Sequence, residues 1–267
     1  MFKLNKFLSI FLLLLISLII YRKINFYLKD KARFEPYSKV DRRVSVECPS
    51  DGIYIGVIGQ SNAANHIDKK YSDPKNYRAY SFYKNKCYLI QDPIPGASGN
   101  GGSIWSYFSI KLANKLKQNV VIINNAIGAT SVKDWSGNKY GLYSRFKNSL
   151  KDLEDNGFKL SYLIWFQGET DAQIGTSSEM YIENFNNLFL KIKNQKAYEV
   201  GKSKTFIFQT SVCHYNFKGD ASIRNAQAEL IKMHNDVYLA MNTDMLGDEF
   251  RYDGCHFNFS GVKRISK

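Results

Sequence analysis

The stretch Gly52–Asn62 reads GIYIGVIGQSN, an apolar run that ends in glycine and passes at once into polar residues. Short apolar runs bounded by turn residues are typical of strands that are buried on both faces. We therefore expect a strand over Gly52–Gly59. Four similar runs follow it along the chain: Val120–Asn124, Leu160–Phe166, Thr205–Thr210 and Val237–Met241.

Segments with helical spacing lie between these five expected strands: Ser103–Lys117, Leu142–Leu153, Met180–Ile192 and Ser222–His234. Strands that alternate with helices predict an α/β fold, with a mainly parallel, five-stranded sheet covered by helices on both faces. In such sheets the functional site forms at the carboxyl ends of the strands. The polar segments that deserve attention are therefore Gly59–Asn62, Asn125–Ser131, Gln167–Asp171, Cys213-His214 and Asp253–His256.

Three residues of these segments predict nucleophilic catalysis. Ser61 follows the first expected strand and begins an expected helix, but a serine hydroxyl needs a base before it can attack. Asp253 stands three residues before His256, so that in a tight turn its carboxylate can accept the imidazole N–H. Ser61 alone would also fit a helix N-cap, and an isolated Asp-x-x-His would fit a surface turn. Together the three residues predict a nucleophile, its base and the residue that orients the base.

Acyl transfer also needs hydrogen-bond donors for the oxyanion of the tetrahedral intermediate. We expect the backbone N–H of Ser61 to be one donor. A backbone N–H of the Gly128–Ala129 turn is the expected second donor, and the side-chain amide of Gln167 is the expected third.

Six segments carry a resemblance to a known family: GQSN at 59–62, GASGNGGSIW at 96–105, NNAIGATSVKDW at 124–135, WFQGETDA at 165–172, RNAQ at 224–227 and DGCHFN at 253–258. From residue 51 onward the chain resembles the SGNH (GDSL-type) hydrolases, specifically the branch of sialate O-acetylesterases and acetylxylan esterases. The resemblance implies a flavodoxin-like, three-layer α/β/α sandwich and ester hydrolysis without metal or cofactor. It also implies Ser61 as nucleophile, His256 as base and Asp253 as its partner, with Gly128 or Ala129 and Gln167 in the oxyanion hole.

Two features depart from the family pattern. The second block usually has two consecutive glycines, whereas the second position here is Ala129, so a left-handed backbone there would be strained. The chain also stops eleven residues after His256, where family members usually continue into a fuller helix. We therefore expect a short C-terminus in the hydrolase domain, which we place at 51–267.

Several other residues are candidates for substrate contacts, each with a structural alternative. The candidates in the motif segments are Gln60, Asn62, Trp105, Glu169 and Arg224. Trp105, Trp135, Tyr140 and Phe257 would suit either a wall for stacking sugars or the core. Glu169 and Asp171 would suit a catalytic carboxylate pair, but because the Ser-His-Asp set already provides the base, we expect them to orient the loop of the third block. Arg224 would suit either a substrate carboxylate or support of the sheet. His66 and His214 would suit substrate contacts or the surface, and His234 a structural role.

The N-terminus contains an uncharged run, FLSIFLLLLISLIIY, at Phe7–Tyr21, preceded by Lys3 and Lys6. This pattern is typical of an export signal, and no small-x-small cleavage site follows it. We expect an uncleaved membrane anchor over 1–21, a basic lead-in over 22–50 and a catalytic domain outside the cytoplasmic membrane. The five basic residues after the run argue for the opposite orientation. A hydrophobic helix packed into the fold is the structural alternative.

Composition and cysteine pattern bear on three further questions: nucleic-acid binding, metal sites and disulfides. The net charge is +13, and removal of residues 1–33 leaves 30 basic and 23 acidic residues, a mild excess without the basic and aromatic stripe of nucleic-acid binders. The sequence contains neither a CxxC nor an HExxH motif, either of which would indicate a metal site. The four cysteines fit either two disulfides, whose pairing stays open, or unpaired buried thiols. The sequence gives no indication of the oligomeric state.

The sequence therefore predicts a serine esterase that removes O-acetyl groups from a carbohydrate through an acetyl-enzyme on Ser61. Sialic acid, a xylan-type polymer and a surface polysaccharide all remain open as the acetylated glycan. The alternatives are an O-acetyltransferase that acts on a glycan and a catalytically silent glycan-binding module on the membrane.

Overall fold

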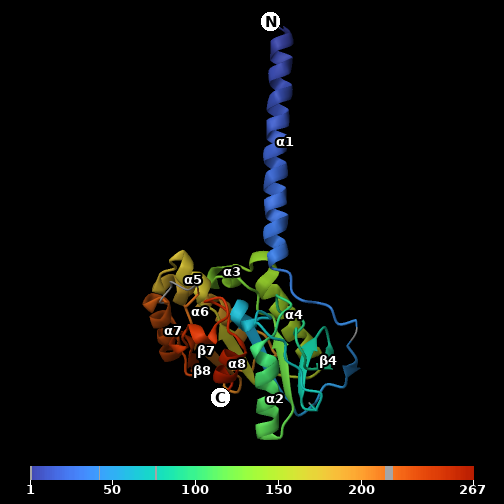
Figure 1. Cartoon of the computed structure of the whole chain (residues 1–267), viewed down its shortest axis with the longest axis vertical. Helices are drawn as coiled ribbons and strands as arrows, with labels where there is room; N and C mark the ends of the chain where they lie inside the picture. Colours follow the sequence, from blue (N-terminus) through green and yellow to red (C-terminus); the bar gives the residue numbers. More distant parts are fainter. Residues whose placement is uncertain (1, 42, 76, 214–218) are drawn as a thin grey trace. The chain divides into compact units, whose positions relative to one another are not determined.

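The computed structural model describes residues 2–41, 43–75, 77–213 and 219–267. The chain divides into two compact units, Met1–Glu35 and Pro36–Lys267 (Figure 1). The first unit is a single helix, α1 (Phe2–Arg33), which continues from the expected anchor into the expected lead-in. Its segment Phe11–Ala32 is long and apolar enough to cross a membrane, and none of it is buried. A signal sequence would meet the same criterion, so the helix alone does not establish an anchor.

The second unit is built on one eight-stranded sheet with the order β1-β4-β3-β5-β2-β6-β7-β8. Its five parallel strands on the expected segments are β2 (Ile53–Gly59), β5 (Val120–Asn124), β6 (Tyr162–Phe166), β7 (Lys204–Gln209) and β8 (Val237–Asn242). The α/β class with a mainly parallel sheet is therefore confirmed.

The strand count is corrected from five to eight by a sheet edge that the sequence did not reveal. β3 (Ala79–Tyr83) runs parallel to β5, β4 (Lys86–Leu89) pairs with β3 in a hairpin, and β1 (Ser45–Val46) pairs with β4. The hairpin turn is Lys84-Asn85, with φ values of 50° and 61°, the conformation of a type I′ turn. This turn lacks the glycine that usually signals it, and neither strand shows a regular alternation of buried and exposed residues.

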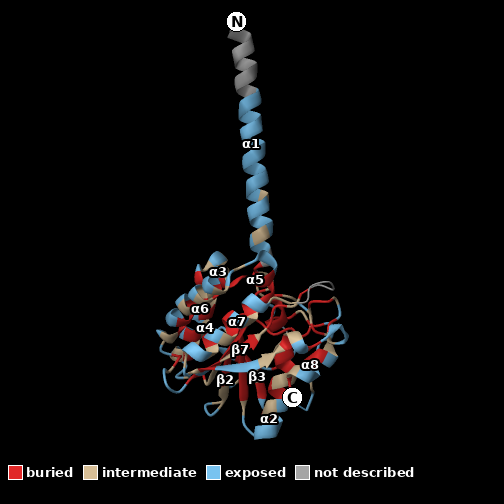
Figure 2. Ribbon diagram, turned by 90° about the vertical axis from the view of Figure 1, so that its left-hand side faces the viewer, coloured by how far each residue is buried: buried red, intermediate tan, exposed pale blue. Residues whose placement is uncertain are grey.

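Helices cover both faces of the sheet, which gives the three layers (Figures 1 and 2). α2 (Ile104–Leu116) and α8 (Phe259–Ile265) lie on one face. The other layer contains α3 (Val132–Ser136), α4 (Leu142–Asp155), α6 (Ser178–Lys193) and α7 (Ala221–Met233). The short α5 (Glu169–Ile174) follows β6. The described 3₁₀ helices are η1 (Ser61–Ala63), η2 (Lys139–Gly141), η3 (Thr243–Met245) and η4 (Asp248–Phe250).

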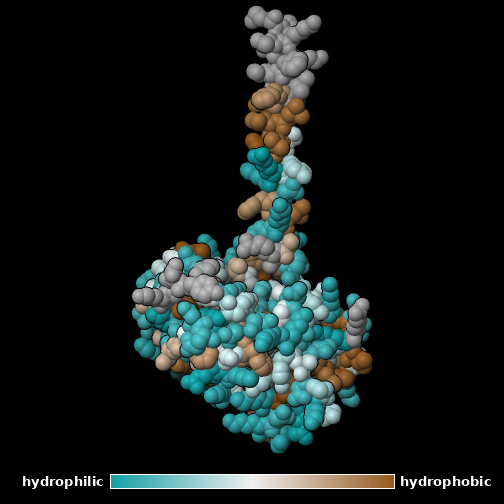
Figure 3. All heavy atoms as spheres, viewed as in Figure 1, coloured by the Kyte–Doolittle hydropathy of each residue, from teal (hydrophilic) through white to brown (hydrophobic). Residues whose placement is uncertain are grey.

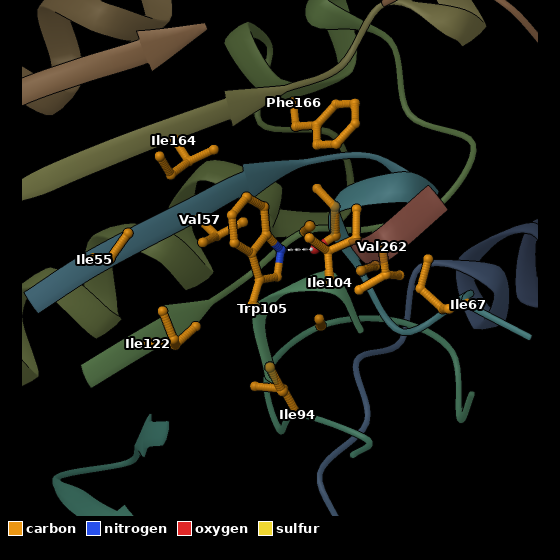
Figure 4. Packing of buried hydrophobic residues seen from close by; sticks show 14 of the residues in the cluster. Ile55, Val57, Ile67, Ile94, Ile104, Trp105, Ile122, Ile164, Phe166 and Val262 are labelled. Atoms are coloured by element: carbon orange, nitrogen blue, oxygen red, sulfur yellow. Dashed lines mark hydrogen bonds between the residues drawn. The ribbon is translucent and has the colours of Figure 1, made fainter. Parts of the chain in front are cut away.

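The alternation of side chains along β2 shows how the two layers are held. Val57 points toward α2 and packs in the same buried cluster as Trp105 (Figure 4). The neighbouring Gly56 faces the opposite layer, where Phe146 of α4 closes on it. Trp105 also donates from Nε1 to the carbonyl oxygen of Ala63, 2.7 Å away. The core is therefore tied to the segment that follows β2.

Two disulfides resolve the pairing that the sequence left open. Cys48 is bonded to Cys87 on β4, which joins the lead-in to the sheet edge, so the folded unit begins before the expected boundary at residue 51. Cys213 is bonded to Cys255 in the turn that contains His256. Figure 3 shows a largely hydrophilic surface on this unit and apolar residues along α1.

Candidate active site

Ser61 is placed by a sharp turn at the carboxyl end of β2. Gly59 has a φ of 140°, and a β-carbon there would overlap the carbonyl oxygen of Phe166, so only glycine fits. The N–H of Gln60 donates to that same carbonyl oxygen at 3.1 Å. Ser61 then begins η1 and is 6% exposed. As a first helical residue, its N–H has no partner within the helix.

Asn62 joins this turn to the loop of His256. Its Nδ2 donates to the carbonyl oxygen of Cys255 at 3.2 Å, and its Oδ1 accepts from the N–H of Phe257 at 3.3 Å. These two contacts hold the residues on either side of His256 against the neighbour of Ser61. The same Nδ2 donates to Oε1 of the buried Glu169 at 2.7 Å. The side chain of Asn62 therefore ties the segment of Ser61 to the backbone on either side of His256.

Asp253 and His256 form the expected pair. Nδ1 of His256 lies 2.6 Å from Oδ2 of Asp253, and Oδ1 accepts from the N–H groups of Cys255 and His256 at 3.0 and 2.7 Å. Partial burial alone would raise the pKa of Asp253, but the hydrogen bonds and the charge of His256 outweigh burial and lower it. The carboxylate is therefore ionised at neutral pH and can accept a hydrogen bond from a proton on Nδ1 of His256.

The remaining contact between serine and histidine is open in this structure. Among the described residues, neither the Ser61 hydroxyl nor Nε2 of His256 has a hydrogen-bond partner. Hydrogen bonds of this kind often tighten only when substrate binds.

The Gly128–Ala129 turn lies against Ser61. A β-carbon on Gly128 would stand 3.5 Å from Cβ of Ser61. Ala129 is exposed and has a φ of 56°, the left-handed conformation that its side chain strains. The N–H of Gly128 donates to Oγ of Ser98 at 2.7 Å, so it is already engaged. Of the two expected backbone donors, only the N–H of Ala129 has no hydrogen-bond partner among the described residues.

Residues 52–267 match the sequence model of a family described as "carbohydrate esterase, sialic acid-specific acetylesterase". The chain belongs to this family. The resemblance to the sialate O-acetylesterase branch of the SGNH hydrolases is thereby confirmed. No curated protein matches the sequence significantly.

Solved structures share the fold of this carbohydrate esterase. A protein of Arabidopsis thaliana has 15% identity and a TM-score of 0.59, over 80% of this chain and 94% of that one. The carbohydrate acetylesterase XAC1771 from Xanthomonas citri has 18% identity and a TM-score of 0.56, over 80% of this chain and 54% of that one. NanS has 12% identity and a TM-score of 0.58, over 82% and 95%. At these identities the likeness shows the fold alone.

The side-chain amide of Gln167, the expected third oxyanion donor, is engaged within the protein. It is fully buried, and its Nε2 donates to the carbonyl oxygen of Thr130 at 3.0 Å, to Oδ2 of Asp171 at 2.5 Å and to Oε1 of Gln60 at 3.2 Å. With three acceptors around one amide, neither N–H is free for a substrate. In this esterase Gln167 instead ties the second and third motif segments to the segment after β2.

The expected substrate contacts are also corrected. Gln60, Asn62, Trp105 and Glu169 are all buried, and each bonds within the protein. Oε1 of Gln60, for example, accepts from the N–H of Thr170 at 3.1 Å. Arg224 pairs with Asp244 at 2.7 Å and contacts Ser211 at 3.1 Å, which supports the structural alternative for it. Each of these side chains therefore has a polar group engaged within the protein.

Burial also decides among the aromatic candidates. Trp135 and Phe257 are fully buried and belong to the core, whereas Tyr140 is half-buried at η2. Nε2 of His234 lies 2.8 Å from Oδ1 of Asn186, an acceptor to which a protonated Nε2 donates, in keeping with a structural role. His214 lies outside the described residues. Among the described residues, no three His, Cys, Asp or Glu side chains gather as a metal site would require.

The structure places His66 beside His256, a contact that the sequence did not predict. Its ring stacks on the ring of His256 with centroids 5.5 Å apart, and Tyr252 stacks on His256 at 5.9 Å. The hydroxyl of Tyr252 also donates to the carbonyl oxygen of His66 at 3.2 Å. His66 follows Ser61 by only five residues, and that short spacing was the available signal.

His66 should make the folded state less stable in acid. Burial is the main cause that lowers the pKa of His66 to about 4; the charge of His256 lowers it further, and Asp253 raises it. Unfolding restores a pKa of about 6.5, so the unfolded chain binds more protons between these values, and the free energy of unfolding rises with pH there. The full effect is at most about 3 kcal/mol.

Urea unfolding at pH 4.5 and pH 6.5 measures this effect. We expect the wild-type protein to lose more stability at the lower pH than His66→Gln, whose amide does not titrate. Equal losses in the two proteins would contradict the assignment to His66.

Proposed function

We propose that this chain is a serine esterase that removes O-acetyl groups from a carbohydrate through an acetyl-enzyme on Ser61. The observation that carries the proposal is the 2.6 Å contact between Asp253 and His256, held next to Ser61 by the contacts of Asn62. Family membership supports a carbohydrate ester as the substrate class.

In the proposed mechanism, His256 Nε2 takes the proton of the Ser61 hydroxyl while Oγ attacks the acetyl carbon. The π electrons of the carbonyl move onto its oxygen, which the N–H groups of Ser61 and Ala129 stabilise. When the carbonyl re-forms, the bond to the sugar oxygen breaks, and that oxygen takes the proton from His256. A water molecule then repeats the sequence on the acetyl-enzyme and releases acetate.

The sugar needs a surface beside the reacting ester. Tyr252 is 46% exposed and lies next to His256. With Trp105, Trp135 and Phe257 buried, Tyr252 is the aromatic side chain that we place along the sugar ring.

We further propose that the catalytic unit works outside the cytoplasmic membrane, held by α1. The apolar helix and the two disulfides support this location, because disulfides persist in oxidising compartments.

Incubation of the full chain in mild detergent with O-acetylated sialic acid and acetylated xylo-oligosaccharide tests the function. We expect free acetate from at least one substrate, and a fluorophosphonate adduct that mass spectrometry locates on Ser61. An unacetylated acceptor sugar in a parallel reaction detects transfer, in which acetylated acceptor would exceed free acetate. Absence of the Ser61 adduct in a folded protein would contradict the proposal and favour a binding module.

A further inference from the structure

Ser98 lies in the glycine-rich segment before α2 and is held on both sides by backbone contacts. Its N–H donates to the carbonyl oxygen of Ala126 at 2.9 Å, and its carbonyl oxygen accepts from Asn65 at 2.9 Å. The side chain is 4% exposed. The backbone therefore fixes this hydroxyl between the segments that follow β2 and β5.

Three groups of different segments converge beside Gly128. A β-carbon built on this glycine would lie 3.5 Å from Cβ of Ser61, 3.5 Å from Oγ of Ser98 and 3.2 Å from Nε2 of His66. Ser98 is therefore a neighbour of Ser61 at the turn that would supply the backbone oxyanion donor. The absence of a side chain at Gly128 leaves room for this cluster.

The hydrogen bonds of Ser98 can fill both acceptor positions of its oxygen, but they provide no acceptor for its hydroxyl proton. Oγ accepts from the N–H of Gly128 at 2.7 Å and lies 3.2 Å from Nε2 of His66. A hydroxyl has two acceptor positions and one donor. If His66 carries its proton on Nε2, both acceptor positions are filled, and the buried O–H proton still needs an acceptor.

We propose that the Ser98 hydroxyl donates a hydrogen bond to the oxyanion, in the place expected for Gln167, and that His66 is the positioning residue that orients this hydroxyl. The inference rests on the proposed esterase function and adds a catalytic residue to the same site. Gly128 contributes indirectly, because its N–H holds the Ser98 oxygen instead of contacting the substrate.

The charge state of His66 fits this role. Burial and the charge of His256 keep the pKa of His66 low, so His66 stays neutral while His256 becomes the imidazolium. A neutral imidazole has one N–H, which Ser98 accepts, and it adds no positive charge next to the protonated base.

Ser98 keeps its proton through the reaction. As Ser61 Oγ bonds to the acetyl carbon and His256 takes the serine proton, the carbonyl π pair becomes a lone pair on oxygen. Ser98 donates to that oxygen without transferring its proton. When the carbonyl re-forms and the sugar oxygen leaves with the proton from His256, the hydrogen bond weakens again.

The full chain with Ser98→Ala tests the inference on the acetylated substrate that the wild-type protein hydrolyses. Loss of one oxyanion donor typically lowers kcat about 100-fold, so we expect a fall of that order with KM changed less than threefold. The rate of fluorophosphonate labelling at Ser61 should fall in parallel. Ser81→Ala is the matched control, because Ser81 is a buried serine of β3 whose hydroxyl has no partner among the described residues.

Two variants of His66 test its positioning role independently of Ser98→Ala. His66→Gln retains an N–H donor near the position of Nε2 and should keep most of kcat, whereas His66→Leu should approach the loss seen in Ser98→Ala. Combining His66→Leu with Ser98→Ala should add little, because both remove the same hydrogen bond. If Ser98→Ala does not fold, the difference in kcat between His66→Gln and His66→Leu still tests the inference.

Different results would overturn the inference and the proposed function. A wild-type protein that releases acetate, with Ser61→Ala inactive and Ser98→Ala within twofold of wild type, overturns only the role of Ser98. Equal kcat for His66→Gln and His66→Leu overturns the role of His66. A folded wild-type protein without acetate release or a Ser61 adduct overturns the esterase function itself.

Discussion

Ser61→Ala is expected to lower kcat for acetate release by roughly 10⁴- to 10⁶-fold. Alanine has no hydroxyl to form the acetyl-enzyme, and neither His256 nor the oxyanion donors can replace it. KM should change little, because the expected sugar contacts involve other residues. The measurement is free acetate released over time from the acetylated sugar, together with the fluorophosphonate adduct, which should be absent.

Stability should not account for that loss. Ser61 is a small residue at the start of η1, and its hydroxyl bonds to no described residue, so thermal unfolding should match that of the Ser81→Ala control. A Ser61→Ala protein that hydrolyses the acetylated sugar at the wild-type rate would remove the acetyl-enzyme from the mechanism.

Asp253→Asn is expected to lower kcat about 10⁴-fold. The carboxylate accepts the proton-bearing Nδ1 of His256 at 2.6 Å, whereas an asparagine amide facing Nδ1 favours a proton on Nε2 instead. Nε2 could then no longer take the proton of Ser61. Initial rates from pH 5 to 9 measure the loss, which should persist across the range because asparagine does not titrate.

The neighbouring acid Asp248 on η4 supplies the control, as Asp248→Asn. The low pKa of Asp253 means that its ionisation stabilises the folded state above the pKa of the unfolded chain and is lost as pH falls through the lower folded-state value. Asp253→Asn should therefore remove stability at neutral pH as well. An Asp253→Asn enzyme with wild-type kcat would show that His256 needs no orienting carboxylate.

The sequence predicted the centre of the sheet better than its edge. β2, β5 and β6 are almost wholly buried, so their apolar runs signal strands directly. β3 is only partly buried, β4 has exposed ends, and the two turn at Lys84-Asn85, so only the finished hairpin shows that they pair. Edge strands are specified by neighbours distant in sequence more than by their own composition.

In the candidate site, too, the sequence predicted the contacts between near neighbours in the chain but not those between distant segments. Asp253 and His256 are three residues apart, so a local turn suffices to predict their contact. Gln167 occupies an expected segment, but its side chain is directed by acceptors on Thr130 and Asp171 that only the folded chain brings together. Ser98 lies in the glycine-rich motif segment at 96–105, yet its approach to Gly128 depends on two separate loops. The catalytic roles themselves stay predictions.

Because the contacts of Asn62 join distant parts of the chain, the time at which activity begins depends on when the chain has folded. The hydrogen bond from Phe257 to Asn62 spans 195 residues. During synthesis or export, Ser61 emerges long before the segment that would activate it. A nascent chain interrupted ahead of Asp253 would carry a serine without its base, and esterase activity would begin only when the two distant segments have closed on one another. Hydrolysis would therefore serve as a reporter of completed folding.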